Sequence, residues 1–475
     1  MICAADTVGV FQIESRGQMS MLPRLKPRCW YDLVIEVAIV RPGPIQGNMV
    51  HPYLRRRNGD EPVVYPNEEI KAVLHRTLGI PIFQEQAMKL AVVAAGFTPG
   101  EADQLRRAMG KWRKTGLINQ FHEKLINGMK ERGLTGEFAE QVFRQISGFG
   151  EYGFPESHAA SFAKLVYVSA WLKHYYPAAF CASIINSLPM GFYAPAQLVA
   201  DAKAHGVQVL PVDVNHSQWD CTIEHDVTDP KSDPQSEHLL RLGLRMISGL
   251  RNDVAELIVE QRCSGQYTSV SDFTRRTQLG QAIVAQLSKA DAFGSVNQDR
   301  RAALWQALGQ EKKAKHQPLF AGLETRDDDT LALPTLAPQD EVTEDYRSVG
   351  LSLRAHPISF QRESLDQLNV TCCGRLTEKP NNRQLRVAGL VILRQRPSTA
   401  KGITFVTLED ETGTANLIVK QDVWKRYYKI ARRSPAWIAH GKLEMKSGIT
   451  HVIVNRIEDM SCRLDELNIK SRDFR

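Results

Sequence analysis

Apolar side chains recur every three to four positions through most of the first 185 residues, which is the spacing of helices with one buried face. Glycine and proline separate these segments, and Pro177 is expected to end the last long one. The predicted helices are Glu85–Gly96, Gly100–Arg113, Leu117–Arg132, Gly136–Ser147 and Ser161–Tyr175.

Beyond residue 185 the segments of regular apolar spacing become shorter. A helix is expected over Ala194–His205, followed by a strand over Val207–Asn215. Thr222–His238 is polar and contains two prolines, so we expect an exposed loop there. From Leu239 to Leu308 the pattern predicts short helices joined by tight turns.

Two of these turns place a glycine between apolar residues, in Ile247–Arg251 and in Ala290–Gly294. Helix–hairpin–helix modules use such a turn to aim backbone amides at a DNA phosphate, because a side chain at the glycine would intrude. A glycine that ends a helix explains each copy about as well, so the pattern by itself leaves both interpretations open.

The last third of the chain changes to strand patterns. Gln310–Val342 is expected to be a linker because it has little periodicity and several prolines and aspartates. A short helix, Gln421–Ile430, is predicted between the third and fourth of five strands, which is the order of an OB-fold. The predicted strands are Gln384–Gln395, Ile403–Glu409, Thr414–Val419, Ala436–Met445 and Ile449–Asn455.

Composition places this pattern in a multidomain globular protein. The 475 residues are too many for one core, and 43% hydrophobic and 24% charged residues are ordinary for a folded chain. The formal net charge of +7 is compatible with a polyanionic partner. The cations are concentrated in Arg55–Arg57, Arg106–Lys114 and Lys425–Arg433.

Eight cysteines occur without a CxxC pair, which excludes a zinc knuckle and favours reduced thiols. No apolar run approaches the length of a membrane span, and no signal peptide is visible at the start. We therefore expect a cytoplasmic protein that has no membrane partner and no metal site.

Two blocks carry the chemistry. Leu105–Lys114 packs five cations into ten residues, and like charges at helical spacing repel unless an anionic partner binds. Gly148–Ala163 is a glycine-rich loop that runs through Ser157 and His158 into a helix, so its backbone can approach a ligand closely. Together they predict a surface that binds phosphates. A solvated basic helix beside an ordinary turn is the alternative.

With three further segments, these blocks resemble the fingers of bacterial C-family DNA polymerases, the DNA polymerase III alpha subunits. Leu165–Val199 and the closing sequence SRDFR are most similar to the error-prone, damage-inducible paralogue. The resemblance covers essentially the whole chain, and its five blocks keep the family's order. The three further segments are Gly9–Leu25, Arg41–Val50 and Gly79–Ala91.

The resemblance implies a mainly α-helical fingers region with a tandem helix–hairpin–helix module, followed by a five-stranded β-barrel of the OB type. The expected boundaries are residues 1–185 for the fingers, 186–310 for the little finger and hairpin region, 311–383 for a linker, 384–460 for the OB-fold and 461–475 for a C-terminal tail.

By the same resemblance, the incoming triphosphate is expected at Arg106, Arg107, Lys111, Ser157 and His158, with Arg41 as a weaker member. Taken alone, His158 fits a core histidine better, and only the motif favours a ligand contact. The expected DNA contacts are Lys114, Gly249, Leu250, Arg251, Gly294, Arg394, Lys401 and Phe405.

Catalytic carboxylates are not found in this sequence. A polymerase holds two metal ions on carboxylates of a rigid palm. The acids of Asp327–Asp329, Asp226, Asp229 and Asp410–Glu411 instead fit solvated turns. In the resembled family the palm precedes the segment matched by Met1–Leu25, so we expect the chain to begin after the catalytic centre. Magnesium is then expected in the complete polymerase, without ligands here, and the chain alone should be inactive.

Two functions arise as hypotheses. The first is the C-terminal portion of an error-prone DNA-directed DNA polymerase in damage-induced mutagenesis and translesion synthesis. It would bind deoxynucleoside triphosphates, primer–template and single-stranded DNA, and other damage-response proteins. A sliding-clamp contact at His316–Phe320 is weakly supported, because His replaces the expected Gln. The alternative is a stand-alone, non-catalytic DNA-binding or adaptor protein.

Overall fold

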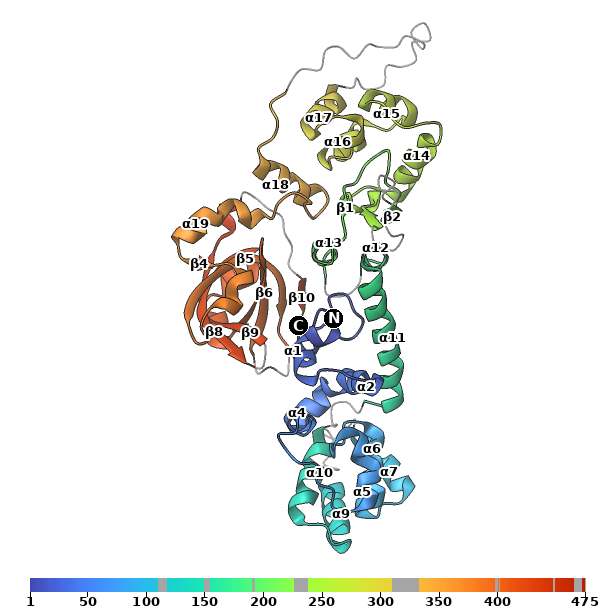
Figure 1. Ribbon diagram of the computed structural model, residues 1–475, viewed down its shortest axis with the longest axis vertical. Helices are drawn as coiled ribbons and strands as arrows, with labels where there is room; N and C mark the ends of the chain where they lie inside the picture. Colours follow the sequence, from blue (N-terminus) through green and yellow to red (C-terminus); the bar gives the residue numbers. More distant parts are fainter. Residues whose placement is uncertain are drawn as a thin grey trace. The chain divides into compact units, whose positions relative to one another are not determined.

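The chain divides into two compact units, Met1–Tyr175 and Tyr176–Arg475, which we call unit 1 and unit 2 (Figure 1). The computed structural model describes residues 1–109, 118–148, 154–189, 193–225, 238–309, 333–397, 400, 402–446, 449–464 and 472–474.

Unit 1 is helical in its described residues, which confirms the prediction from the apolar spacing. α11 begins earlier than predicted because the carbonyl of Pro155 already accepts the amide of Ala159 (3.0 Å). The elements are η1 (Ile2–Ala4), α1 (Arg16–Leu25), α2 (Trp30–Ile39), α3 (Pro42–Gln46), α4 (Val50–Asn58), α5 (Glu68–Leu74), η2 (His75–Thr77), α6 (Gln84–Ala95), α7 (Pro99–Met109), α9 (Ile118–Glu131), α10 (Gly136–Gly148) and α11 (Glu156–Tyr175).

Helix α2 forms the centre of unit 1. Residues from Asp32 to Ile39 are all buried, and α1 and α11 pack against the helix. Glu36 lies fully buried among them, so burial raises the pKa of its carboxyl well above the usual range. With its amide nitrogen turned toward α2, Gln18 donates to the Glu36 Oε1 (2.6 Å) and carbonyl (3.1 Å). The core of unit 1 therefore contains a carboxyl group held in its neutral form.

The cation run Arg55–Arg57 at the end of α4 has a structural role. Arg57 forms a bidentate ion pair with Asp32 (2.7 and 2.8 Å) and donates to the Leu25 carbonyl (2.7 Å). Arg55 and Arg56 both pair with Glu61 (2.9 Å each). Burial alone would raise the pKa of Asp32, but the hydrogen bonds from Arg57 and from backbone amides outweigh it and lower that pKa. These arginines thus join α4 to α2 and to the loop after α4.

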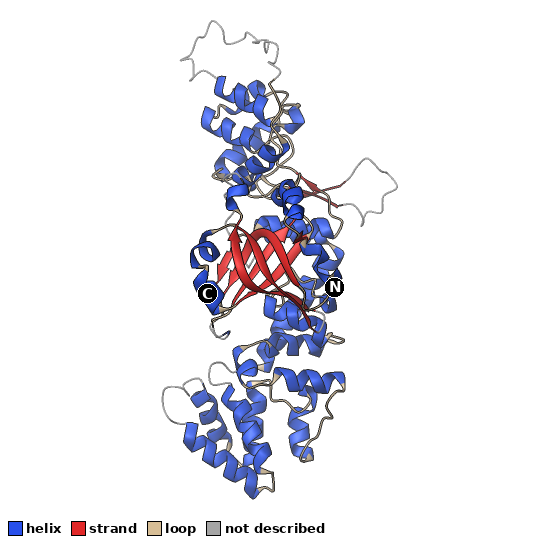
Figure 2. Ribbon diagram, turned by 90° about the vertical axis from the view of Figure 1, so that its left-hand side faces the viewer, coloured by secondary structure: helices blue, strands red, loops and turns tan. Residues whose placement is uncertain are grey.

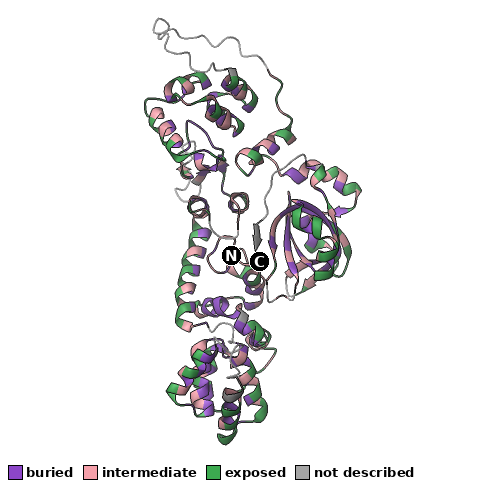
Figure 3. Cartoon of the chain, turned by 180° about the vertical axis from the view of Figure 1, so that it is seen from behind, coloured by how far each residue is buried: buried purple, intermediate pink, exposed green. Residues whose placement is uncertain are grey.

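Helix α11 exposes several large apolar side chains, and exposed positions recur along it in Figure 3. Its buried face is made of small residues that pack on α2, including Ala159, Ala163 and Val166. Neither α11 nor any other helix in the described part of the chain has the length and apolarity to cross a membrane. The large exposed side chains are Leu165, Tyr167, Val168, Trp171, Leu172 and Tyr175.

Unit 2 opens with α12 (Pro177–Asn186) and α13 (Pro195–Ala204), before a small sheet in the order β1-β3-β2. Its strands are β1 (Val209–Leu210), β2 (Thr222–His225) and β3 (His238–Arg241). β2 and β3 pair antiparallel, so the predicted exposed loop over Thr222–His238 is wrong at both of its ends. Residues 226–237 lie outside the described residues.

The predicted strand over Val207–Asn215 is also wrong beyond Leu210, because buried polar side chains replace strand pairing there. The Asp213 carboxylate accepts the amides of Asn215 (2.7 Å) and Ser295 (2.9 Å) and the Ser295 hydroxyl (2.7 Å). Asn215 in turn pairs through its side chain with both backbone groups of Tyr267. This segment therefore ties the sheet to the helices of residues 244–309.

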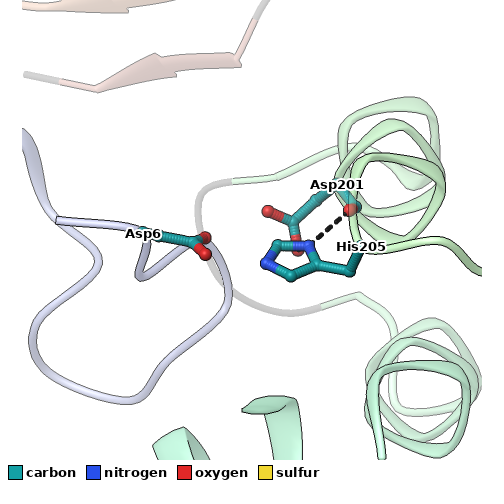
Figure 4. Close-up of side chains that lie close together, drawn as sticks. All are labelled: Asp6, Asp201 and His205. Atoms are coloured by element: carbon teal, nitrogen blue, oxygen red, sulfur yellow. Dashed lines mark hydrogen bonds and ion pairs between the residues drawn. The ribbon is translucent and has the colours of Figure 1, made fainter. Parts of the chain in front are cut away.

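At the end of α13, His205 Nδ1 lies 2.7 Å from the Asp201 carbonyl and 3.8 Å from its carboxylate (Figure 4). Asp6, drawn in the same figure, belongs to unit 1 and forms an ion pair there with the buried Lys173 (3.0 Å). Both histidine contacts are local, and they close the C-terminal turn of the helix.

The next part of unit 2 is helical, as predicted, and extends beyond the sequence expected to form it. α18 lies within the predicted linker, where it is fixed by buried ion pairs. Arg300 is 3% exposed and pairs with Glu341 (3.0 Å) and Asp345, which also binds Arg354 (2.9 Å). The elements are η3 (Leu244–Met246), α14 (Asn252–Arg262), α15 (Val270–Thr277), α16 (Gln281–Lys289), η4 (Gly294–Val296), α17 (Arg300–Gly309) and α18 (Pro338–Ser348).

The five predicted strands form a closed barrel, shown by the crossing strands in Figure 2. Neighbouring strands take the order β5-β6-β7-β9-β8, and β8 pairs back onto β5 to close it. Two short helices stand between the third and fourth strands, which confirms the OB-fold. The elements are β5 (Gln384–Gln395), β6 (Thr404–Asp410), β7 (Gly413–Val419), α20 (Gln421–Arg426), α21 (Tyr428–Arg433), β8 (Ala436–Lys446) and β9 (Ile449–Asp459).

Alternation along the strands fills the barrel with aliphatic side chains around the fully buried Trp437. Two glycines permit close approach of neighbouring strands. A Cβ on Gly389 would lie 2.5 Å from the Glu409 carbonyl oxygen, and one on Gly441 would lie 2.4 Å from that of Ile453. The barrel thus has the dense core that strand periodicity predicts.

Short elements cover the outside of the barrel. Ile358, Leu365 and Val370 pack against the outer side of β5 and β8. β10 (Arg472–Phe474) pairs parallel with β5 at residues 393–395, so the predicted C-terminal tail contributes a strand. The other covering elements are η6 (Pro357–Gln361), α19 (Arg362–Gln367), β4 (Val370–Thr371), η7 (Cys373–Glu378) and η9 (Ser461–Arg463).

Candidate nucleotide-binding and DNA-binding surfaces

The beginning of α11 is held against the beginning of α6. The amide of Gln84 donates to the carbonyl of the buried Phe154 (3.2 Å), and the amide of Glu156 donates to the Glu85 carboxylate (3.0 Å). The Glu156 side chain is also bound, because it accepts the Tyr31 hydroxyl (2.6 Å). Residues 149–153 of the glycine-rich loop lie outside the described residues. The first turn of α11 is therefore fixed in position by α6 and Tyr31.

Ser157 and His158 are exposed on the first turn of α11 and line an open hollow of about 400 Å³ with Pro155 and Ser161. The His158 ring lies 4.2 Å from the Phe162 ring, centroid to centroid, and 5.3 Å from that of Phe154. The exposed position excludes the core-histidine alternative. A hydroxyl and an imidazole thus face a space open to a ligand.

Arg41 reaches the same aromatic group from the start of α3. Its guanidinium lies 4.7 Å from the centroid of the Phe154 ring, and its Nη2 donates to Gln12 Oε1 (2.6 Å). The Nε donates to the Val37 carbonyl (3.2 Å). Phe154 therefore connects Arg41 with His158, a link that the sequence pattern did not reveal because Phe154 is an ordinary core residue by type.

Arg106 and Arg107 lie at the end of α7, with 41% and 74% of their side chains exposed. Both form ion pairs with Asp103 (2.9 and 2.8 Å), so the repulsion expected of the basic block is partly relieved within the helix. The structure does not bring these arginines into contact with Ser157 or His158 within the described residues. Lys111 and Lys114 lie outside the described residues.

Asp103 is a partner that the sequence interpretation missed. It precedes Arg106 by three residues and Arg107 by four, which is the spacing of ion pairs along a helix, so the signal was present just outside the chosen block.

The first hairpin turn keeps free amides. Gly249 adopts a φ of 79°, and the Ser248 amide donates to the carbonyl of Ser348 (2.8 Å). The amides of Gly249, Arg251 and Asn252 donate to no acceptor among the described residues. They stand at the N-terminus of α14, where the helix dipole favours an anion. Arg251 itself is exposed and pairs with Asp253.

Leu250 and the second turn differ from the prediction. Leu250 is 8% exposed and packs inside, so a DNA contact through its side chain is contradicted. Gly294 begins η4 without a positive φ, and the Ser295 amide is bound by Asp213 (2.9 Å). Its turn is closed by further internal bonds, which contradicts the prediction of a phosphate site at Gly294.

On the barrel, only part of the predicted DNA contacts are accessible. Arg394 is 6% exposed and donates to the carbonyls of Ala431 (2.8 Å) and Ser434 (2.5 Å), so burial contradicts its DNA contact. Phe405 is half-buried on the outer side of β6, directly opposite Ile418 of β7. Lys401 lies outside the described residues. Of the predicted barrel contacts that the structure describes, Phe405 is therefore the accessible one.

The family described as bacterial DNA polymerase III alpha subunit finger domain matches residues 1–133, and the helix-hairpin-helix motif matches residues 206–303. The chain is 59% identical over 479 residues to the error-prone DNA polymerase of Rhodopirellula baltica. It is 51% identical over 495 residues to that of Sinorhizobium medicae and 49% identical over 485 residues to that of Methylococcus capsulatus. Each alignment covers all of this chain. Along its whole length, the chain is similar to part of these error-prone DNA polymerases.

The chain spans less than half the length of these error-prone DNA polymerases, 41%, 44% and 46% respectively, and it matches their C-terminal part. The finger-domain match includes Arg41, Arg106 and Arg107, and the hairpin match includes Gly249 and Gly294. The resemblance predicted from the sequence blocks is confirmed.

Magnesium, which the resemblance implies for a complete error-prone DNA polymerase, needs clustered oxygen ligands. Within the described part of unit 2, ligand atoms of Cys372, Asp410 and Glu411 lie within 4.8 Å of one another. Arg362 forms ion pairs with Asp410 (3.1 Å) and Glu411 (2.5 Å). A thiol beside two carboxylates bound to arginine does not fit magnesium, and no step is assigned to a metal there.

Proposed function

We propose that this chain is the part of an error-prone DNA-directed DNA polymerase that holds the incoming nucleotide and the primer–template DNA. The identity of 59% along the whole chain to the Rhodopirellula baltica enzyme carries this proposal. The catalytic carboxylates and their magnesium ions would then be supplied by the part of the polymerase that this chain does not span.

The nucleotide would bind in unit 1 at two groups of residues. Ser157 and His158 offer hydrogen bonds from the open hollow at the start of α11. Arg106 and Arg107 carry guanidinium groups whose two-pronged geometry suits phosphate oxygens, and they would exchange Asp103 for the triphosphate. Lys111 would add a further cation to the phosphate contacts. Arg41 would act through Phe154 by positioning His158.

DNA would bind along unit 2. The unpaired amides around Gly249 suit a backbone phosphate, with Arg251 beside them, and Phe405 can stack on an unpaired base. Lys114 and Lys401 would add phosphate contacts. We further propose a role in damage-induced mutagenesis and translesion synthesis in the cytoplasm, together with other damage-response proteins. A clamp contact at His316–Phe320, outside the described residues, remains a weaker part of the proposal.

The purified chain is expected to bind primer–template DNA with an affinity that falls steeply as salt rises, because each neutralised phosphate releases counterions. Fluorescence anisotropy with a labelled primer–template from low to physiological salt measures this. The logarithm of affinity should decrease linearly with the logarithm of salt concentration. Undetectable binding at low salt, or binding that ignores salt, would contradict the proposed DNA role.

Arg107→Ala is expected to weaken binding of a deoxynucleoside triphosphate by about ten- to a hundredfold, because one charge-assisted phosphate contact is lost. DNA affinity should change little. Equilibrium binding of labelled nucleotide to the full chain with primer–template measures the first, and anisotropy measures the second. Arg144→Ala, an exposed arginine on α10, is the matched control. If DNA affinity falls while nucleotide affinity stays constant, α7 contacts the template instead.

A further inference from the structure

The two helices between the third and fourth barrel strands have one buried face. Val423 and Ala431 lie inside the barrel core, at 6% and 0% exposure, and Trp424, Tyr427 and Ile430 pack partly against it. α20 and α21 also lie against β9. Since the apolar residues fix these helices to the barrel, their opposite face has a defined position on the surface of the OB-fold.

That opposite face carries a run of cations. The segment from Gln421 to Arg433 holds five basic residues and one acid, Asp422, a net charge of +4. None of the five forms an ion pair with a carboxylate among the residues that the structure describes. We call this surface the α20–α21 face. Its cations, all exposed, are Lys425, Arg426, Lys429, Arg432 and Arg433.

Three other arginine groups among the described residues pair with nearby carboxylates. Asp32 and Glu61 pair with the run in α4, Asp103 pairs with the pair in α7, and Asp272 pairs with both arginines near the end of α15. On the α20–α21 face, by contrast, Lys429 stands three residues before Arg432 and four before Arg433 within α21, a spacing at which like charges destabilise a helix. An anionic ligand would remove this repulsion.

An exposed aromatic side chain lies among these cations. Tyr428 is 46% exposed, and Arg432 Nη1 donates to its hydroxyl (2.5 Å) with the guanidinium 5.8 Å from the ring centroid. Cations that contact phosphates beside an aromatic ring that can stack on a base are the usual elements of single-strand binding. A duplex would offer phosphates but no free base face for the ring.

We propose that the α20–α21 face binds the backbone of single-stranded DNA, with Tyr428 stacking on one base. This inference rests on the proposed polymerase function and adds a surface to it, separate from Phe405 on β6. The strand would be held by Lys429 and Arg432, which lie three residues apart on α21 and so share one side, together with Lys425 near the end of α20.

The test removes three cations together, Lys425→Gln, Lys429→Gln and Arg432→Gln, in the full chain. Affinity for a labelled oligothymidylate should fall about ten- to a hundredfold, as expected for several lost ion pairs. The salt slope should also become shallower by about 2, because each single-strand phosphate contact contributes about 0.7. The matched control, Arg375→Gln, Arg383→Gln and Lys442→Gln, removes three exposed cations elsewhere on the same barrel and should keep both values.

A second variant, Tyr428→Leu, separates stacking from charge. It should weaken oligothymidylate binding and leave duplex binding and the salt slope unchanged. If the wild-type chain binds no DNA, the proposed polymerase function itself fails. If it binds DNA and the triple variant matches the control in affinity and slope, only the present inference is overturned, and an acidic protein surface becomes the ligand of the α20–α21 face.

Discussion

Asp345→Ala is expected to destabilise the attachment of α18 to Arg300 at the start of α17 by about 3–5 kcal/mol, the effect of removing one partner of a buried ion pair. Arg300 is 3% exposed, and its guanidinium would keep Glu341 as its remaining carboxylate. The same substitution removes the acceptor for Arg354 (2.9 Å) and for the Ser352 hydroxyl (2.7 Å).

Because the chain contains several domains, a single global unfolding free energy is not defined, and native-state hydrogen exchange is the suitable measurement. Amides of α17 and α18 should lose protection in Asp345→Ala. Arg347→Ala is the matched control, since it lies on the same helix with 40% of its side chain exposed and pairs with Glu344. An exposed pair of this kind contributes at most about 1 kcal/mol. Equal protection in both variants would contradict the importance of the buried pair.

Glu36→Gln is expected to stabilise unit 1 at pH 8 and to have little effect near pH 4. Burial raises the pKa of Glu36 in the folded protein, whereas the unfolded chain ionises this residue near its ordinary pKa of about 4.3. Between these two values the folded state keeps a proton that the unfolded state loses. Wild-type stability therefore falls by about 1.4 kcal/mol per pH unit from this residue, and glutamine removes the loss.

Calorimetry of the full chain at several pH values, monitoring the transition of unit 1, measures this difference. Glu69→Gln, at an exposed position on α5, is the matched control and should track the wild type at every pH. Gln18 can donate to an amide oxygen at position 36 as it does to the carboxyl oxygen. If Glu36→Gln is no more stable than the wild type at pH 8, the carboxyl is not held neutral in the core.

The sequence predicted best where one periodicity ran through a whole element. Helices in unit 1 and the five barrel strands were correct because burial on one side repeats every three to four residues or every two. The helical segment between β7 and β8, which forms α20 and α21, was predicted for the same reason.

The prediction from sequence failed where polar contacts between distant residues determine the backbone conformation. The Asp213 carboxylate accepts a hydrogen bond from Ser295, which lies far along the chain. No local pattern around Val207–Asn215 could therefore show that the strand stops at Leu210. Likewise, α18 was assigned to a linker because its polar sequence hides the pairing of Asp345 with Arg300.

The candidate DNA contacts were predicted from residue type, and the structure corrected some of them by showing which groups are accessible. Arginine and glycine at the right spacing suggested DNA contacts for Arg394 and Gly294, yet Arg394 bonds to backbone carbonyls inside the barrel and the turn of Gly294 is closed by Asp213. Which side of an element faces solvent depends on its neighbours, and a single sequence does not contain that information at strand ends and turns. His158 shows the opposite outcome, since the core position that its residue type favoured is excluded by its exposure, while its ligand contact stays a prediction.

The buried pairing of Arg300 with Asp345 also bears on how the sequence between the two helices can evolve. α17 ends at Gly309 and α18 begins at Pro338, and the Arg300–Asp345 ion pair joins the two helices that flank the intervening stretch. The free energy needed to bring two positions of a chain together rises only weakly with the number of residues between them, by about 0.6 kcal/mol for each doubling. Insertions and deletions in this stretch should therefore be nearly neutral for the fold, which leaves it free to gain or lose short recognition peptides.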